Sequence, residues 1–384
     1  MGRRVPGRAG NLARRRAPST RPCRSPRPGH GLDLLVRLLG SLQRQAVRCE
    51  NLGSPMYAEL LRRLVDDYEV GGVSADVLAG YEDPPPGSVI GLRLLGAVHG
   101  LVLAGEVPEL AAFYPSVGGV WDPVLGWEAF EQVLRSRSGE VRALLTQPPQ
   151  TNEVRRSAAL YGGLLQLVRE VPLPVRLFEM GASAGLNLRA DHFRYDADGE
   201  SYGAADSPVV IENAWSGQVL KPAAVRIVER VGCDTAPVNP LSAAGARTLT
   251  SYVWPDMSER LARLRAALEV ARQVPADVRR EDAVSFVRGL EVVPGQVTVL
   301  WHSIMWQYLT DEDRAAVDAQ LAELGERADE SAPLARLRFE PGLEAFLVEL
   351  EIWPGGARRV LGRIEDHGQG LVWELPSDDE RHLR

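Results

Sequence analysis

Hydrophobic residues recur at helical spacing through the first part of the chain. Leu60, Leu61 and Leu64 share one face of a helix, and a second apolar helix is indicated near residues 88–103. Glycines and a run of prolines separate these patterns, and few segments resemble strands. We therefore predict a helical cap domain over residues 31–150.

From residue 151 the pattern changes to short apolar runs that alternate with helical faces. The runs predict strands, and their alternation with helices predicts crossover connections and a mostly parallel sheet. The last two runs, joined by a turn, predict an antiparallel hairpin. The strands are expected at residues 175–180, 225–231, 297–301, 334–339, 346–353 and 359–364. The predicted fold is therefore α/β, with a Rossmann-like sheet over residues 151–376.

Capping patterns indicate where the helices of this second region begin. Asp256 and Glu259 are spaced as a capping box, and Thr310 precedes another helix. Thr151 or Asn152 can cap the helix before the first strand. Helices are therefore expected near residues 154–168, 257–271 and 310–325.

The composition indicates a globular protein with an acidic body. Hydrophobic residues make up 45% and charged residues 25% of the 384 positions, so a sizeable core can form. Residues 1–30 contain nine arginines and no acid, and without them the formal net charge falls from −7 to −16. Because an acidic surface repels phosphates, we do not expect residues 31–384 to bind nucleic acid.

Both ends of the chain are predicted to be tails, over residues 1–30 and 377–384. The first is rich in arginine, proline and glycine and has little to bury, so we expect it to be disordered. It is either an arm for nucleic acid or an extension from an upstream start codon. No apolar segment follows its arginines as a signal peptide requires.

Several other classes of protein are excluded by what the sequence lacks. No apolar run approaches the about 20 residues of a membrane span. Cys23, Cys49 and Cys233 lie far apart, which supports neither a disulfide framework nor a zinc site. The six histidines show no metal-binding spacing. We expect a cytoplasmic protein with no membrane partner and no bound metal.

The candidate chemistry follows the first predicted strand. That strand ends in Glu179-Met180 and continues into Gly181-Ala182-Ser183-Ala184-Gly185. Glycines let a ligand approach the backbone, and the N–H groups of such a loop and of the next helix favour an anionic group. Ligands of parallel sheets bind beyond the carboxyl ends of the strands. Asp234, Asp282 and His302 are expected at the same edge.

Two motifs carry a resemblance to a known family. The first is Glu179-x-Gly181-x-Ser183-x-Gly185, and the second is Gly232-x-Asp234-x-x-Pro237. Both resemble class I S-adenosylmethionine-dependent methyltransferases, which usually have glycine where Ser183 stands. The resemblance implies a methyltransferase-type sheet, S-adenosylmethionine as cofactor, and a small or medium acceptor of unknown identity.

The resemblance also implies roles for individual residues. Asp234 would accept the ribose hydroxyls, Asp282 would face the adenine amine, and His302 would act as a base for the acceptor. Each also has a structural interpretation, as a helix cap, a strand-end residue or a hydrogen-bonded core histidine. The implied cofactor contacts are Glu179, Gly181, Ser183, Gly185, Asn187, Asp234 and Asp282. The implied contacts over the pocket are Asn152, Glu153, Trp306 and Tyr308.

Three phrases carry a second resemblance, over residues 35–376. They are Thr151-Asn152-Glu153, Gly181-Ala182-Ser183-Ala184-Gly185-Leu186-Asn187, and Trp301-His302-Ser303-Ile304-Met305-Trp306-Gln307-Tyr308. In these the chain resembles bacterial domain-of-unknown-function family 2332. That resemblance implies no particular activity.

Two alternative functions remain open. Gly181-x-Ser183-x-Gly185 also fits the nucleophile elbow of a serine hydrolase, with Asp256 or Asp282 and His302 or His367 completing a triad. Against this, the hydrolase fold places several strands before its elbow, and residues 31–174 indicate helices. The second alternative is a non-catalytic module that binds a nucleoside or a protein on the same sheet.

Overall fold

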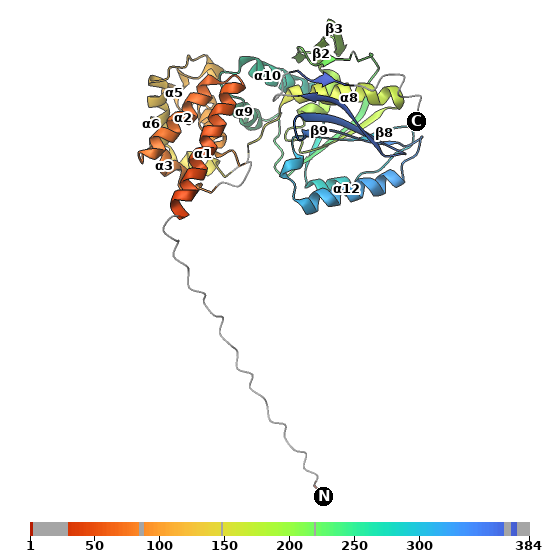
Figure 1. Ribbon diagram of the computed structural model, residues 1–384, viewed down its shortest axis with the longest axis horizontal. Helices are drawn as coiled ribbons and strands as arrows, with labels where there is room; N and C mark the ends of the chain where they lie inside the picture. Colours follow the sequence, from red (N-terminus) through yellow and green to blue (C-terminus); the bar gives the residue numbers. More distant parts are fainter. Residues whose placement is uncertain (3–29, 84–87, 147–148, 219, 365–369, 375–384) are drawn as a thin grey trace.

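The computed structural model describes residues 1–2, 30–83, 88–146, 149–218, 220–364 and 370–374. Most of the two predicted tails, residues 3–29 and 377–384, lies outside these ranges. Figure 1 shows a group of helices beside an α/β unit. We call residues 30–146 the helical lobe and residues 149–374 the sheet lobe.

The helical lobe packs its amphipathic helices around a core of its own. Leu42, Leu61 and Leu94, from three different helices, are fully buried in this core. The prediction of helices in the N-terminal region is confirmed. They are α1 (His30–Asn51), α2 (Pro55–Glu69), α3 (Val73–Leu78), α4 (Ile90–Leu103), α5 (Pro108–Ala111), the 3-10 helix η1 (Pro115–Val117), α6 (Leu125–Ser136) and α7 (Ser138–Leu144).

A nine-stranded sheet forms the centre of the sheet lobe. Its order is β5-β12-β11-β10-β9-β8-β1-β6-β7. The strands from β7 to β9 are parallel, and β10, β11 and β12 follow in antiparallel pairing. The predicted mostly parallel sheet with terminal antiparallel strands is confirmed. Its strands are β1 (Val175–Met180), β5 (Ser216–Gly217), β6 (Ile227–Asp234), β7 (Asp277–Arg280), β8 (Val297–Ser303), β9 (Leu334–Pro341), β10 (Phe346–Trp353), β11 (Ala357–Ile364) and β12 (Val372–Trp373).

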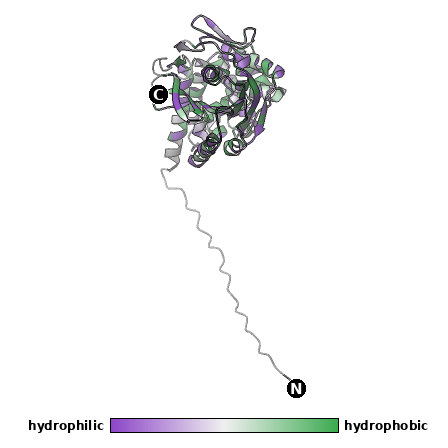
Figure 2. Cartoon of the chain, turned by 90° about the vertical axis from the view of Figure 1, so that its right-hand side faces the viewer, coloured by the Kyte–Doolittle hydropathy of each residue, from purple (hydrophilic) through white to green (hydrophobic). Residues whose placement is uncertain are grey.

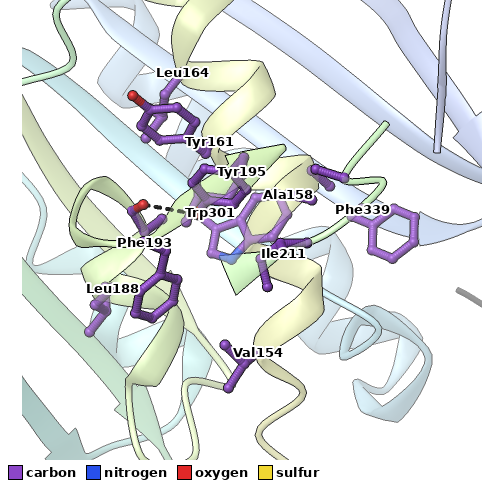
Figure 3. Packing of buried hydrophobic residues seen from close by; sticks show 14 of the residues in the cluster. Val154, Ala158, Tyr161, Leu164, Leu188, Phe193, Tyr195, Ile211, Trp301 and Phe339 are labelled. Carbon is purple, nitrogen blue, oxygen red and sulfur yellow. Dashed lines mark hydrogen bonds between the residues drawn. The ribbon is translucent and has the colours of Figure 1, made fainter. Parts of the chain in front are cut away.

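Helices cover both faces of the sheet, and this explains why its central strands are apolar throughout. All seven residues of β8 are buried, as expected for a strand covered on both sides. Trp301 points to the face covered by α8 (Figure 3), and Leu300 points to the face covered by α11 and α12. The helices of this lobe are η2 (Val154–Arg156), α8 (Ser157–Glu170), η3 (Leu186–His192), α9 (Ala243–Ser251), α10 (Ser258–Gln273), α11 (Ala283–Arg288), η4 (Trp306–Tyr308) and α12 (Asp311–Glu326).

A small second sheet lies beside the large one. It has the order β3-β2-β4, from β2 (Arg194–Ala197), β3 (Glu200–Gly203) and β4 (Val210–Ile211). Asp198 and Gly199 join β2 to β3 with φ of 50° and 83°, so the turn signal at these residues marks a hairpin. The hairpin lies at the top of Figure 2, where its hydrophilic residues are coloured purple. Among the described residues, no helix is long and apolar enough to cross a membrane.

The order of strands reverses beside β1. From β1 the chain adds β6 and β7 on one side, then crosses to β8 and β9 on the other. At such a reversal the connections from β1 and β8, two neighbouring strands, lead away in opposite directions and leave a crevice at their carboxyl ends. Ligands of open parallel sheets bind in this crevice. The carboxyl ends of β1, β6 and β8 are therefore where the fold favours a site.

Residues 243–257 of the sheet lobe join the two lobes. Helix α9 packs against α4, and Trp254 is buried in the core of the helical lobe. Asp256 accepts hydrogen bonds from Ser54 Oγ at 2.6 Å and from the Met56 amide at 3.0 Å. Asp256 therefore caps α2, and the prediction that it caps its own helix with Glu259 is wrong: the N-cap residue of α10 is Met257.

Candidate functional site

The loop after β1 is held in shape by the end of β6. The amide of Ser183 donates to Asp234 Oδ2 at 2.9 Å, and the amide of Ala236 donates to Asp234 Oδ1 at 2.8 Å. The amide of Ala182 donates to the carbonyl of Cys233 at 2.9 Å. Asp234 thus ties two loops together at the carboxyl ends of neighbouring strands.

Left-handed backbone explains the glycines of this loop. Gly181 and Gly185 have φ of 68° and 65°, and Ser183 between them has φ of 53°, which is uncommon for a residue with a side chain. A Cβ on Gly181 would lie 2.9 Å from Met305 Cβ, and one on Gly185 would lie 2.6 Å from Val278 Cγ2. The glycines therefore serve close packing as well as the turn.

The helix that follows the loop differs from the prediction. The loop leads into η3, a 3-10 helix of seven residues, and Arg189 inside it has non-helical backbone angles. The helix N-terminus expected at this loop therefore belongs to a short, irregular 3-10 helix.

Residues 150–153 lie along the loop. Gln150 Oε1 accepts from Ser183 Oγ at 2.8 Å, and Asn152 Oδ1 accepts from the amide of Leu186 at 2.9 Å. The carbonyl of Glu153 accepts from Asn187 Nδ2 at 3.3 Å. The structure thus places Asn152 and Glu153 next to the loop, and of the two Glu153 also lines the cleft described below.

Glu179 lies beneath the loop and away from solvent. Its side chain is on the same face of the sheet as Trp301, its partner on β8, and Glu179 is 2% exposed. Burial raises the pKa of Glu179 to about 8, against the opposing effects of the neighbouring Trp301 side chain and of Arg156 and Arg189. Glu179 is therefore protonated at neutral pH. Its Oε2, Trp301 Nε1 and Asn187 Oδ1 are buried without hydrogen-bond partners among the described residues.

His302 is enclosed in a polar network between β8 and β9. Its Nδ1 lies 2.8 Å from Glu340 Oε1, and Arg336 Nε donates to its Nε2 at 3.2 Å. Burial lowers the pKa of His302, so the ring is neutral, donates to Glu340 and accepts from Arg336. The residue is fully buried. Both ring nitrogens are occupied, which favours the structural interpretation over that of a base.

The loop after β8 is positioned by this network. Glu340 Oε1 also accepts from the amides of Met305 at 3.1 Å and Trp306 at 3.3 Å. The Trp306 ring stacks on His302 with centroids 5.1 Å apart, and Arg336 lies 4.6 Å from its centroid. Trp306 is therefore a packing residue, while Tyr308, 67% exposed, lines the cleft described next.

A cleft of about 1940 Å³ lies between the helical lobe and the carboxyl end of the sheet. Gly181, Ser183 and Asp234 line it from β1 and β6, and Ser303 lines it from β8. Tyr57, Arg93 and other residues of the helical lobe form the opposite wall. The volume exceeds the ~300–1,000 Å³ of ordinary small-molecule sites, so the cleft has room for more than one small ligand.

A protein-family model matches residues 40–373, across both lobes and the cleft between them. It describes the family as "Uncharacterized protein conserved in bacteria (DUF2332)". The chain belongs to this family. No match was found among curated proteins or among solved structures.

Asp282 of this DUF2332 chain caps a helix. Its Oδ1 accepts from the amide of Ser285 and its Oδ2 from Ser285 Oγ, both at 2.8 Å. These two bonds lower the pKa of Asp282. Its neighbours Glu281 and Ala283 line the cleft. Asp282 itself is not among the residues that line the cleft with Gly181, Ser183 and Asp234.

The geometry of the DUF2332 chain gives the hydrolase alternative little support. Ser183 Oγ donates to Gln150, and no described histidine hydrogen-bonds to it. His302 is held by Glu340 and Arg336, Asp256 caps α2, and His367 lies outside the described residues. β1 is also the first strand in the described chain. Described Asp, Glu, His and Cys residues form no group that could hold a metal.

Sequence reasoning missed three polar residues of the DUF2332 cleft. Gln150 contacts the loop, and Arg156 and Arg263 line the cleft. Arg156 belongs to the short helix η2, and Arg263 lies on α10, whose local pattern indicates only an apolar face. Their positions relative to the loop depend on tertiary contacts, so no sequence signal could have found them.

Proposed function

We propose that this chain binds S-adenosylmethionine at the carboxyl ends of β1 and β6 and acts as a methyltransferase-like enzyme on a small or medium acceptor. One observation carries the proposal: Gly181, Ser183 and Asp234, from adjacent strands at the reversal of strand order, face one large cleft. This combines the two motifs of the resemblance in space and leaves room for two ligands.

The residues present fit the nucleoside part of the cofactor. A carboxylate offers about four acceptor positions, and the two amide bonds to Asp234 use two of them, so ribose hydroxyls can still donate to it. Gly181 is exposed to the cleft and presents backbone without a side chain. Glu179 is assigned to holding the loop from below, since it is protonated and buried.

The fit also assigns a place to the amino-acid part. Arg156 lines the cleft and donates from Nη1 to the carbonyl of Ser303, at the end of β8, at 3.4 Å. Its guanidinium would meet a carboxylate placed beside the loop. The proposal gives no cofactor contact to Asp282, because Asp282, unlike Asp234, is not among the residues that line the cleft.

The chemistry makes modest demands on the chain. When bound, the cofactor supplies an electrophilic methyl group. The protein has to hold the acceptor about 3 Å from it, in line, and exclude water. Tyr308 and the other residues of the loop after β8 would line the acceptor's side of the cleft. His302 acts by positioning that loop through Glu340, and it does not reach the cleft.

A second candidate is a non-catalytic binding module. The bonds from Ser183 to Gln150 and from Leu186 to Asn152 occupy polar groups of the loop that a ligand would otherwise use. A ligand that is bound without being brought to react would not need these polar groups to be free. The two candidates share the site and differ in turnover.

Calorimetric titration with S-adenosylmethionine and S-adenosylhomocysteine tests the proposal. We expect wild type and Asp282→Asn to bind alike, because Asp282 caps α11. Asp234→Asn removes the charge that accepts ribose hydroxyls, so we expect its affinity to fall about tenfold or more.

Absence of binding to wild type at millimolar ligand would overturn the proposal, as would equal binding by the two variants. Circular dichroism checks that both variants are folded. Tight binding without formation of S-adenosylhomocysteine, when metabolite extract is supplied as acceptor, would favour the binding module.

A further inference from the structure

Four arginines converge on one part of the cleft. Arg155 and Arg156 belong to η2, and Arg260 and Arg263 belong to α10. All four line the cleft. Arg156 reaches the end of β8 through its bond to the Ser303 carbonyl, so the cluster lies beside the carboxyl edge of the sheet. We call these four residues the arginine subsite.

A single half-buried carboxylate faces the arginine subsite. Glu153 pairs with Arg260 and accepts the amide of Arg155 at 3.1 Å. Burial by itself would raise the pKa of Glu153, but Arg260, Arg263 and Arg156, together with that amide bond, lower it. The charge around Glu153 is thus strongly positive.

The other acids near the subsite compensate little. Glu212 and Glu259 act on Arg155 but are exposed to solvent, where screening weakens their effect. Glu340 also acts on Arg156 and is buried, so its charge offsets part of the positive charge. The four guanidiniums still outnumber Glu153 and Glu340, the two carboxylates near them that are not exposed to solvent, and the arginine subsite keeps an excess of positive charge.

This arrangement costs free energy when no anion is bound. Burial and the neighbouring Arg263 lower the pKa of Arg155. Burial also lowers the pKa of Arg156, with a further contribution from Arg260. Like charges held together in a half-buried site repel, and an anion placed among them removes the repulsion.

Guanidinium donors remain available inside the subsite. Each guanidinium has five N–H donors in a planar fork. Arg263 Nε is buried without a partner, and no described residue hydrogen-bonds to the Arg263 side chain. Arg260 is held by Glu153 and by the Trp254 ring, 6.0 Å from its guanidinium carbon. Arg263 and Arg156 are the side chains best placed to donate to a ligand.

We propose that the arginine subsite binds an anionic group, a carboxylate or a phosphoryl group, of the ligand that occupies the cleft. Planar forks on η2 and α10 suit either group, because both present paired oxygens to bidentate donors. The inference goes beyond the proposed function, since it concerns the charge of the ligand and holds whichever nucleoside binds at β1.

Inorganic phosphate, titrated against chloride at equal ionic strength, tests the subsite directly. For wild type we expect saturable calorimetric binding and a rise in Tm. Arg263→Gln should weaken phosphate affinity about tenfold or more. Arg272→Gln is the matched control, because Arg272 lies on the same helix, is 52% exposed and pairs with Glu269 outside the cleft. It should bind as wild type does.

A second readout separates binding from a merely structural role. In chloride, Arg263→Gln should be at least as stable as wild type, because the substitution relieves repulsion in the subsite. Arg263→Lys keeps the charge but loses the fork, so its phosphate affinity should fall between the other two. The inference is overturned if phosphate does not stabilise wild type, or if Arg263→Gln binds phosphate as Arg272→Gln does.

Competition identifies the source of the anionic group. If saturating S-adenosylmethionine displaces phosphate, the subsite holds the carboxylate of the cofactor. If both bind together, the subsite holds a group of the acceptor, which is then itself an anion. Phosphate binding without any binding of S-adenosylmethionine would support the arginine subsite and end the proposed function.

Discussion

At the scale of single residues, Glu179 is a carboxylic acid that the fold keeps uncharged. Its pKa is raised from 4.5 to about 8 by burial. As pH rises above 4.5, the unfolded chain loses this proton while the folded chain keeps it. The contribution of Glu179 to the free energy of unfolding therefore decreases as the pH rises from 4.5 to about 8.

The substitution Glu179→Gln tests this residue. Glutamine imitates the protonated acid and cannot ionise. We expect the variant to be more stable than wild type at pH 8, by a few kcal/mol at most, and the difference to shrink towards pH 4.5. Urea unfolding at a series of pH values measures this.

Glu170→Gln serves as the control for that series. Glu170 lies at the surface, where it pairs with Arg359, so its replacement should leave the pH profile of stability nearly unchanged. A Glu179→Gln protein that is less stable than wild type at pH 8 would show that the folded state holds Glu179 ionised.

Residue-level prediction from the sequence succeeded where the signal was local. Gly181, Ser183 and Asp234 fall at adjacent strand ends because their motifs directly follow apolar runs. The partners of His302 could not be predicted, because Glu340 and Arg336 come from β9, 38 and 34 residues further along the chain. A histidine at a strand end looks the same whether it faces a cleft or a buried carboxylate.

At the scale of elements, helix α2 depends on a cap from outside its own lobe. Asp256 accepts from Ser54 Oγ and the Met56 amide, and Ser54 Oγ accepts from the Tyr57 amide at 3.4 Å. Asp256→Ala leaves the Met56 amide unpaired. We expect the free energy of unfolding to fall by about 1–3 kcal/mol, measured by urea denaturation.

Asp311→Ala gives the comparison for this cap. The Asp311 side chain is fully exposed and pairs only with Arg314 three residues away, so its loss should cost less than about 0.5 kcal/mol. Equal effects of the two substitutions would mean that Asp256 contributes no more than a surface charge.

Helices and strands were predictable wherever a local pattern sufficed. Apolar runs located β1, β8, β9, β10 and β11, and Thr310 caps α12 as expected, with the Asp313 amide donating to its Oγ1 at 3.1 Å. The capping box at Asp256 failed because its carboxylate binds a helix 200 residues away in sequence. The helix expected after the loop is a short 3-10 helix, in which Arg189 takes non-helical angles.

At the scale of the whole molecule, the two lobes share a tryptophan. Trp254 follows α9 in the sheet lobe, is 8% exposed, and packs in the core of the helical lobe against Tyr57. Trp254→Ala should destabilise the protein by about 3–5 kcal/mol. Amide hydrogen exchange should accelerate more in α2 and α4 than in β1 and β8.

Trp254→Phe provides the milder partner of this experiment. Phenylalanine keeps an aromatic ring against Tyr57, so exchange in α2 and α4 should lie between wild type and Trp254→Ala. Uniform acceleration across both lobes in Trp254→Ala would show that they unfold as one unit and would contradict a local role.

The cleft itself was beyond prediction from sequence. Its walls come from segments near residues 45–57, 150–156 and 251–263, together with the strand ends. Each segment has ordinary local patterns, and contacts between the lobes, such as the packing of α9 on α4 and of Trp254 on Tyr57, bring them together. The amphipathic faces of the helices can be predicted from the sequence. The shape of the cleft depends on which of these faces pack against each other.

The contact between Gln150 and Ser183 has a consequence for ligand selection. A molecule that takes the place of the Gln150 side chain at Ser183 breaks the hydrogen bond between them. A ligand with an oxygen or nitrogen acceptor at that point replaces the lost hydrogen bond. An apolar ligand leaves the Ser183 hydroxyl without an acceptor, which costs about 1–3 kcal/mol. The Gln150 side chain therefore favours polar ligands over apolar ligands of equal size, by roughly ten- to a hundredfold in affinity.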